Sequence, residues 1–139
     1  MRITGRAAVH KWMIETFIKK TRAPQGDDLA VYEALKPILS GGVIYHCGPL
    51  ISGDHVVSAG PTTSGRMARY TEFILDQGVL AIIGKGGLPS LPFRGRAVYL
   101  AYPGGCGAAA AQQLRMKGVH FEELGMAEAL WEFEALDMG

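Results

Sequence analysis

The hydrophobic positions along the chain follow two different patterns. In residues 8–20, Val9, Met13 and Phe17 fall on one side at helical spacing and the lysines fall elsewhere, which predicts an amphipathic helix. Shorter apolar runs have the length of β-strands, and they lead into turns that contain Gly or Pro. These predicted strands cover residues 42–47, 56–59, 79–83 and 97–102.

Helical patterns separate and follow the predicted strands. We expect a short helix at residues 27–35 before Pro37, and a helix at residues 71–77 that starts as early as Ser64 and ends at Gly78. Further helices are predicted at residues 108–117 and 126–133, with a last strand at residues 119–124 between them. Strand, glycine-rich turn and helix therefore recur, which indicates one α/β domain over residues 1–139 with sites at its strand ends.

Composition and charge exclude several functions. With 14 basic and 13 acidic residues the formal net charge is +1, so no broad electrostatic footprint for nucleic acid or an anionic membrane is expected. Every apolar run is far shorter than the roughly 20 residues that span a bilayer. Residues 1–9 contain no signal-peptide hydrophobic region, which by default predicts a cytoplasmic protein. Cys47 and Cys106 lack metal-site spacing, so no metal site is expected within this chain.

Residues 60–67, with the sequence GPTTSGRM, are the richest in potential chemistry. Three hydroxyls and the Arg66 guanidinium lie within one predicted turn at the start of a helix. A carboxylate could accept a bidentate pair of hydrogen bonds from Arg66, while hydroxyls and backbone N–H groups bind its other lone pairs. An ordinary Ser/Thr helix cap followed by a surface arginine explains the same residues equally well.

Two further segments carry candidate binding residues. Lys85 lies in a glycine-rich turn at a predicted strand end, where it could reach a ligand, although the spacing is not that of a nucleotide-binding P-loop. Arg6 and His10 are four residues apart, so on a helix they share a face and could contact one anion. A solvated arginine and a partly buried histidine remain the alternatives for this pair. Cys106 is best explained as a small packed residue in a tight turn.

Five segments occur in an order that matches one enzyme family. They are TGRAAVH (residues 4–10), YHCGPL (45–50), SAGPTTSGRM (58–67), IIGKGG (82–87) and YPGGC (102–106). With these motifs the chain resembles the C-terminal domain of class I fumarases, which is equivalent to the β subunit of two-subunit fumarases and L(+)-tartrate dehydratases. Residues 124–134 also resemble the closing helix of that family. The resemblance implies a swivelling β/β/α fold in a single compact domain.

The resemblance also implies a cofactor and a partner. Class I hydro-lyases use a four-iron four-sulfur cluster held by cysteines of the other domain or subunit, so the cluster is expected on a partner α subunit and none is expected on this chain alone. Thr62 corresponds to the hydroxyl assigned as the catalytic base in the family. Arg66, Arg6 and Lys85 correspond to substrate-binding residues. Thr63, Ser64 and His10 are expected to support them without touching the substrate.

The expected function is that of a hydro-lyase β subunit, inactive without its partner. The leading reaction is the reversible hydration of fumarate to (S)-malate, a step of the tricarboxylic acid cycle. Alternatives are an L(+)-tartrate dehydratase β subunit and a non-catalytic carboxylate-binding or assembly module. The expected partners are a dicarboxylate and the cluster-bearing subunit, in a hetero-oligomer or homodimer, without nucleic acid or membrane. One departure is Ala7, where the family usually carries Asp after the first arginine.

Overall fold

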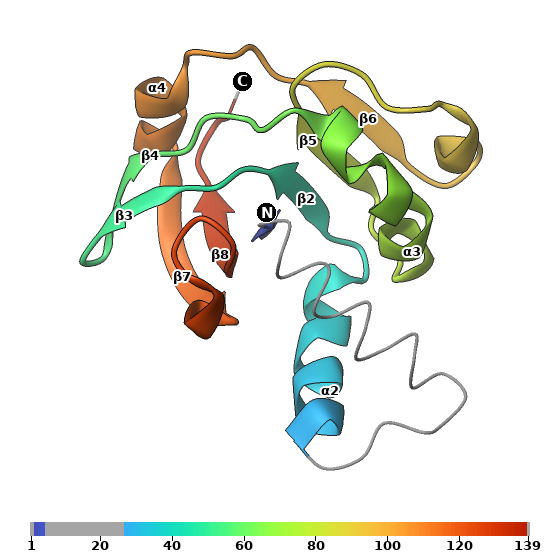
Figure 1. Ribbon diagram of the computed structural model, residues 1–139, viewed down its shortest axis with the longest axis horizontal. Helices are drawn as coiled ribbons and strands as arrows, with labels where there is room; N and C mark the ends of the chain where they lie inside the picture. Colours follow the sequence, from blue (N-terminus) through green and yellow to red (C-terminus); the bar gives the residue numbers. More distant parts are fainter. Residues whose placement is uncertain (1, 5–26, 139) are drawn as a thin grey trace.

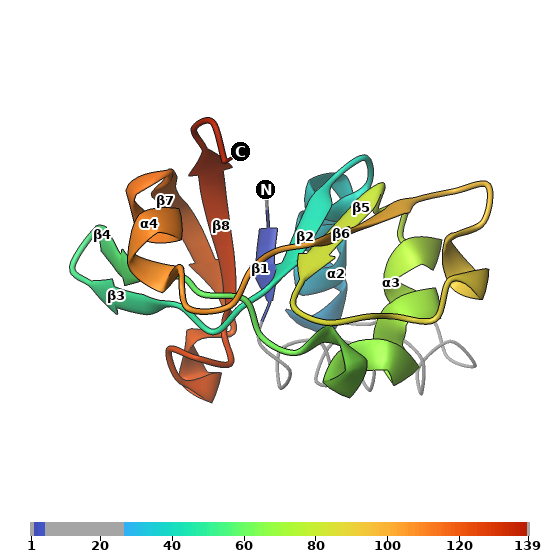
Figure 2. The same ribbon diagram turned by 90° about the horizontal axis from the view of Figure 1, so that it is seen from above.

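A six-stranded mixed sheet forms the centre of the protein in the computed structural model, which describes residues 2–4 and 27–138 (Figures 1 and 2). The strand order is β6-β5-β2-β1-β8-β7. The first four of these strands are mutually parallel, and β8 and β7 extend the sheet in antiparallel fashion. The strands are β1 (Arg2–Thr4), β2 (Val43–His46), β5 (Ala81–Gly84), β6 (Val98–Ala101), β7 (Leu114–His120) and β8 (Leu130–Ala135).

The two faces of the sheet bury separate hydrophobic clusters. On one face, Ile44, Ile82 and Leu130 pack with α2 (Asp27–Leu39) and α3 (Thr71–Asp76). On the other face, Tyr45, Trp131 and Phe133 pack with Leu114 and with residues of a two-stranded hairpin, β3 (Leu50–Ser52) and β4 (His55–Ser58). Successive strand residues point to opposite faces, so the apolar runs of the sequence supply both clusters. The α/β class predicted from the sequence is confirmed.

Smaller elements surround the sheet. The hairpin of β3 (Leu50–Ser52) and β4 (His55–Ser58) lies with α4 (Gly107–Gln112) at one end of the molecule, and α3 lies at the other end (Figure 2). Three short 3-10 helices complete the described part of the chain: η2 (Ser64–Tyr70), η3 (Leu91–Phe93) and η4 (Glu122–Leu124). No helix in residues 27–138 is long and apolar enough to cross a membrane.

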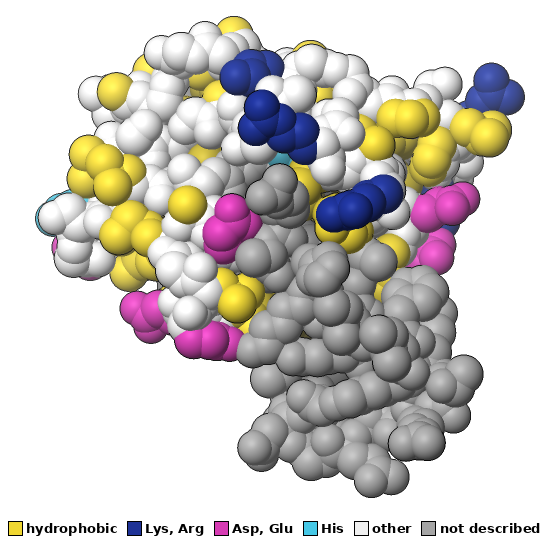
Figure 3. Space-filling view, in the orientation of Figure 1, with side chains coloured by type: hydrophobic (Ala, Val, Ile, Leu, Met, Phe, Trp, Pro, Cys, Tyr) yellow, Lys and Arg dark blue, Asp and Glu magenta, His cyan; other side chains and the backbone are white. Residues whose placement is uncertain are grey.

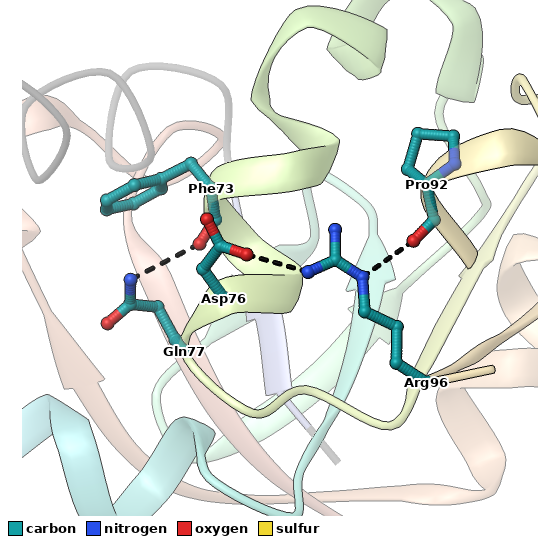
Figure 4. A network of polar contacts seen from close by, with 5 residues as sticks. All are labelled: Phe73, Asp76, Gln77, Pro92 and Arg96. Atoms are coloured by element: carbon teal, nitrogen blue, oxygen red, sulfur yellow. Dashed lines mark hydrogen bonds and ion pairs between the residues drawn. The ribbon is translucent and has the colours of Figure 1, made fainter. Parts of the chain in front are cut away.

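An arginine fastens α3 to the segment that leads into β6. Arg96 donates from Nε to the carbonyl oxygen of Pro92 and from Nη1 to Asp76 Oδ1, both at 2.7 Å (Figure 4). Gln77 adds a weaker contact at the end of the helix, from Nε2 to the carbonyl oxygen of Phe73 at 3.3 Å. Residues 91–96 are therefore held against α3 at the edge of the sheet.

Of two helices predicted near the C-terminus, the first is shorter than predicted and the second is a strand. The predicted helix at residues 108–117 stops at Gln112, and β7 begins at Leu114. Alternating burial of Leu114, Arg115, Met116 and Lys117 shows the strand period that the preceding alanines masked. The predicted helix at residues 126–133 is replaced by β8, because pairing on both sides with β1 and β7 outweighs the helix propensity of its Ala, Leu and Glu residues.

Other boundaries differ from the sequence prediction in detail. The helix expected at residues 27–35 continues through Pro37 to Leu39, and the buried side chains of Leu35 and Leu39 anchor its last turns. The helix expected from Ser64 consists of η2 followed by α3. The strand expected at residues 119–124 ends at His120, and Phe121 then adopts a left-handed φ of 60°. The helix predicted at residues 8–20 lies outside the described residues.

Candidate active site

Three glycine-containing turns follow strand ends at one edge of the sheet. The carboxyl ends of β1, β2, β5 and β6 share this edge because the four strands are parallel, and Thr4 lies in register with His46. Turns at residues 47–49, 85–87 and 102–106 leave β2, β5 and β6 there. Open α/β sheets bind their ligands at this edge.

The segment that contains Thr62 inserts between the ends of β2 and β5. The Thr62 amide donates to the carbonyl oxygen of His46 at 2.6 Å, and the Lys85 amide donates to the carbonyl oxygen of Thr62 at 3.1 Å. The Ser64 amide then donates to the carbonyl oxygen of Lys85 at 2.9 Å, so that Thr63 and Lys85 form an isolated parallel bridge. Two motifs that lie more than twenty residues apart in sequence are thus joined through their backbones.

The hydroxyls of this segment divide into two kinds. Thr63 occupies the N-cap position of η2 but makes no side-chain capping hydrogen bond, which removes the ordinary helix cap as an explanation of the motif. Thr62 and Thr63 are partly exposed, whereas Ser64 is completely buried. Ser64 Oγ lies 3.0 Å from His46 Nδ1 and 3.0 Å from the Tyr99 hydroxyl. Only the threonines can therefore contact a ligand.

Two cations accompany the threonines. Arg66 lies in the first turn of η2, where its amide donates to the carbonyl oxygen of Thr63 at 3.2 Å, and Lys85 follows β5. Both side chains are exposed, and neither forms an ion pair with another residue of the described ranges. Lysine and arginine side chains gather on the upper part of one face, whereas acidic side chains lie below and at its right-hand edge (Figure 3). Unpaired cations beside free hydroxyls suit a carboxylate ligand.

The turn after β6 closes the site from the side. The Tyr102 amide donates to the carbonyl oxygen of Gly84 at 2.7 Å, and the Ala59 amide donates to the carbonyl oxygen of Gly107 at 3.0 Å. Cys106 Sγ donates to the carbonyl oxygen of Pro103 at 2.7 Å. Burial, and secondarily Cys106, raise the pKa of the Tyr102 hydroxyl above its usual value. The segment around Thr62, the turn after β5 and the turn after β6 are therefore connected by backbone hydrogen bonds.

Burial keeps the titratable groups beneath the site uncharged. It lowers the pKa of His46 to about 4, so the imidazole is neutral at pH 7. It raises the pKa of the Cys47 thiol to about 12, and it raises the pKa of Tyr45, whose hydroxyl donates to the carbonyl oxygen of Ala59 at 2.7 Å. A four-iron four-sulfur cluster needs several thiolate ligands, and the sequence contains two cysteines, Cys47 and Cys106, so these alone do not make a cluster site. In residues 2–4 and 27–138 no three His, Cys, Asp or Glu side chains group as a metal site.

The predicted site residues therefore fall into two groups. Thr62, Thr63, Ser64, Arg66 and Lys85 lie in two turns that the structure brings together. Arg6 and His10 lie outside the described residues. Sequence reasoning missed Tyr99 and Gly104, which touch the lysine turn from β6 and from the turn after it. No local pattern marks either residue, because each contact depends on how neighbouring strands align.

The fold and this edge define an α/β domain with a candidate site, containing two exposed cations and two threonines, at the carboxyl ends of parallel strands. The chain belongs to the Fumarase C-terminus family, whose model matches residues 1–139. It is 40% identical over 120 residues to the β subunit of L(+)-tartrate dehydratase from Escherichia coli, covering 77% of this chain and 60% of that subunit. The chain thus spans about 60% of the length of this relative.

Two other relatives carry related names. A Methanocaldococcus jannaschii protein provisionally named as an L(+)-tartrate dehydratase β subunit is 42% identical over 112 residues, covering 73% of this chain and 57% of that protein. A Geobacillus stearothermophilus protein provisionally named as a class I fumarate hydratase is 34% identical over 147 residues, covering 96% of this chain and 25% of that protein. The resemblance found in the sequence is confirmed.

Proposed function

We propose that this chain acts as the β subunit of an iron-sulfur hydro-lyase whose substrate is a four-carbon dicarboxylate, with fumarate hydration to (S)-malate as the leading reaction. The observation that carries the proposal is the backbone pairing of Thr62 with Lys85, in a chain of the Fumarase C-terminus family. This pairing brings to one sheet edge two threonine hydroxyls and two cations that form no ion pair within residues 2–4 and 27–138. A dicarboxylate presents the complementary charges.

The steps assigned to this chain are substrate binding and proton transfer. In the dehydration direction a proton leaves the carbon beside a carboxylate while hydroxide leaves the neighbouring carbon, which gives fumarate and water. As the proton leaves, and before hydroxide has departed, negative charge accumulates on that carboxylate, and Arg66 and Lys85 stabilise it. Arg6, which lies outside the described residues, is assigned to carboxylate binding as well, with His10 supporting it.

Thr62 is assigned as the group that handles the proton. A threonine hydroxyl is a weak base in water, so this role requires the neighbouring cations to favour its deprotonated form. The four-iron four-sulfur cluster belongs to the partner α subunit in this proposal, since the two cysteines of this chain, Cys47 and Cys106, are too few to hold it. Cytoplasmic location remains a prediction from the sequence.

L(+)-tartrate dehydration is the second candidate. Identity to the two proteins with tartrate dehydratase names is 40% and 42%, against 34% to the protein with the fumarate hydratase name. Tartrate differs from malate by one hydroxyl, so the same cations and threonines would bind its carboxylates. Contacts to that second hydroxyl decide between the two substrates.

The test is anaerobic co-expression of this chain with the cysteine-bearing α subunit encoded in the same genome, followed by assays with fumarate and L(+)-tartrate. Turnover of fumarate supports the leading reaction, and turnover of tartrate alone replaces the substrate. Lys85→Met should lower kcat/KM at least tenfold, whereas Lys117→Met, which removes a lysine paired with Glu134 at 3.1 Å on β7, should not. A cluster-loaded complex that is inactive on both substrates would favour a non-catalytic carboxylate-binding module.

The chain purified without its partner offers a second check. We expect it to contain no iron and to show no hydratase activity, because the cluster and part of the substrate site would be missing. Stoichiometric iron and sulfide in the isolated chain would contradict the assignment of the cluster to the α subunit.

A further inference from the structure

Tyr99 joins the two turns of the candidate site from the strand next to them. Its hydroxyl lies 2.9 Å from the carbonyl oxygen of Gly86, within the lysine turn, and 3.0 Å from Ser64 Oγ, at the start of η2. The ring leans against Phe93, with 6.1 Å between centroids, which fixes the direction of the phenol. The Tyr99 side chain is therefore hydrogen-bonded to both segments.

If every contact is a hydrogen bond and each hydroxyl hydrogen serves one contact, the protons of this cluster can be arranged in only one way. The carbonyl oxygen of Gly86 can only accept, so the Tyr99 hydroxyl donates its hydrogen bond to Gly86. The Ser64 hydroxyl must then donate a hydrogen bond to the Tyr99 oxygen, and His46 Nδ1–H must donate a hydrogen bond to Ser64 Oγ. The result is a directed chain from His46 through Ser64 and Tyr99 to Gly86. The buried, neutral imidazole in its Nδ1–H form supplies the first proton.

The space around Ser64 shows that this chain is closely packed. Ser64 is completely buried, and a β-carbon added to Gly84 would collide with Ser64 Oγ. The backbone of Lys85 is also hydrogen-bonded to this segment: its amide donates to the carbonyl oxygen of Thr62, and its carbonyl oxygen accepts from the Ser64 amide. Gly86, the next residue, has a φ of +76°, and no atom lies within 4 Å of where its β-carbon would be, so no neighbour packs against that side of it. The Tyr99 hydroxyl restrains Gly86 through its carbonyl oxygen instead.

We propose that Tyr99 is a positioning residue for Lys85, which it holds at the substrate site by tying Gly86 to Ser64. This inference rests on the proposed function, since it assumes that Lys85 contacts the dicarboxylate. Loss of the phenol hydroxyl removes this tie, while the backbone pairing of Lys85 with residues 62–64 remains. A displacement of about 1 Å in a binding group can lower catalytic efficiency by up to roughly a hundredfold.

The test is a double-mutant cycle in the assembled complex. Tyr99→Phe keeps the ring and removes only the hydroxyl, and it should lower kcat/KM for the active dicarboxylate by about tenfold or more. In a Lys85→Met background the same change should lower kcat/KM by less than about twofold, because the group that Tyr99 positions is gone. Equal losses in both backgrounds, or normal activity of Tyr99→Phe, would overturn the proposal.

Arg96→Met is the matched control. It also removes two hydrogen bonds, to Pro92 and Asp76, close to the start of β6 (Figure 4), and neither bond involves Gly86 or Ser64. It should lower stability comparably and leave kcat/KM within about twofold of the wild type. If Arg96→Met costs as much activity as Tyr99→Phe, general loosening of this edge explains both and the proposal fails.

Amide hydrogen exchange provides a readout that does not depend on activity. In Tyr99→Phe the amides of residues 85–87 should exchange at least several-fold faster, and those of residues 94–97 should not. Unchanged exchange at residues 85–87 would show that Tyr99 does not hold the turn. The two proposals can fail separately. If the wild-type complex is inactive on every dicarboxylate but exchange is still faster in Tyr99→Phe, then the proposed function and the catalytic role of Tyr99 are refuted. The structural role of Tyr99 in holding residues 85–87 would still stand.

Discussion

The side chain of Lys85 crosses directly over Gly104. A β-carbon added at residue 104 would lie 3.1 Å from Lys85 Cδ and 3.9 Å from its Nζ. The aliphatic part of the lysine therefore fills space that any larger residue would occupy, while its side chain remains exposed. Together with the hydrogen bond from Tyr99 to Gly86, this contact defines where the lysine lies.

Enlarging residue 104 should therefore displace the lysine. Gly104→Ala requires a shift of a few tenths of an ångström in a flexible side chain, so we expect a loss of a few-fold in kcat/KM and little change in stability. Gly104→Val should cause a larger loss of activity, because its two methyl groups reach further into the same space. Steady-state kinetics of the assembled enzyme and urea unfolding of the chain would measure both effects. Normal kcat/KM in Gly104→Val would show that the lysine stem can lie elsewhere.

The location of the candidate site could be predicted from the sequence because the chemistry-bearing residues follow directly after apolar strands. Lys85 comes immediately after β5, and its neighbours are glycines, so the turn and the cation are visible in a short window. The segment around Thr62 follows β4, outside the main sheet, and its insertion between β2 and β5 could not be derived from local pattern. The family resemblance assigned Thr62 and Lys85 to one site without indicating this insertion.

The C-terminal part of the fold could not be predicted, for a different reason. Residues 130–135 are rich in helix-forming residues, and only the presence of partners on both sides makes them the strand β8. The role of Tyr99 could not be predicted either, because its contacts with Gly86 and Ser64 depend on the parallel alignment of β6 with β5. Local propensity carries no information about such contacts.

Arg66 is expected to be essential for turnover and unimportant for folding. It is exposed and unpaired among the described residues, so Arg66→Ala should lower kcat/KM at least a hundredfold through loss of a bidentate carboxylate contact, with stability almost unchanged. Arg66→Lys keeps the charge without the planar pair of donors and should recover only part of the activity. Arg69→Ala is the matched control on the same 3-10 helix, where the guanidinium lies 4.7 Å from the centroid of the Tyr70 ring. Near-normal activity of Arg66→Ala would remove Arg66 from the site.

Gly84 should tolerate no side chain while Ser64 is present. Gly84→Ala places a methyl group against the buried Ser64 hydroxyl and 3.4 Å from His46 Cβ, and overpacking of this kind typically costs about 1–3 kcal/mol. In a Ser64→Ala background the most severe clash is absent, so the same substitution should cost less. Urea unfolding of the two single variants and the double variant measures this coupling. Simple additivity of the two losses would mean that the strand moves away instead of pressing on Ser64.

His46 should make stability depend on pH in the mildly acidic range. Burial lowers its pKa from 6.5 to about 4 in the folded protein, so between these values the unfolded chain binds a proton that the native protein does not. Stability therefore falls as the pH drops from about 6.5 towards about 4, by roughly 3 kcal/mol across the full range. Above pH 6.5 the imidazole is neutral in both states and contributes no slope.

Replacing His46 by Gln should remove this dependence while keeping a donor near Ser64. His46→Gln is expected to be less stable than the wild type at pH 7, where the packed imidazole is lost, and to show a flatter decline between pH 6.5 and 4. His55, which is exposed and lies 3.3 Å from Asp54, provides the control, since His55→Gln should leave the wild-type slope in place. Urea unfolding at half-unit pH intervals compares the three proteins. An unchanged slope in His46→Gln would mean that the buried imidazole is not the group responsible, and that the hydrogen-bonded chain through Ser64 to Tyr99 does not begin with a neutral histidine.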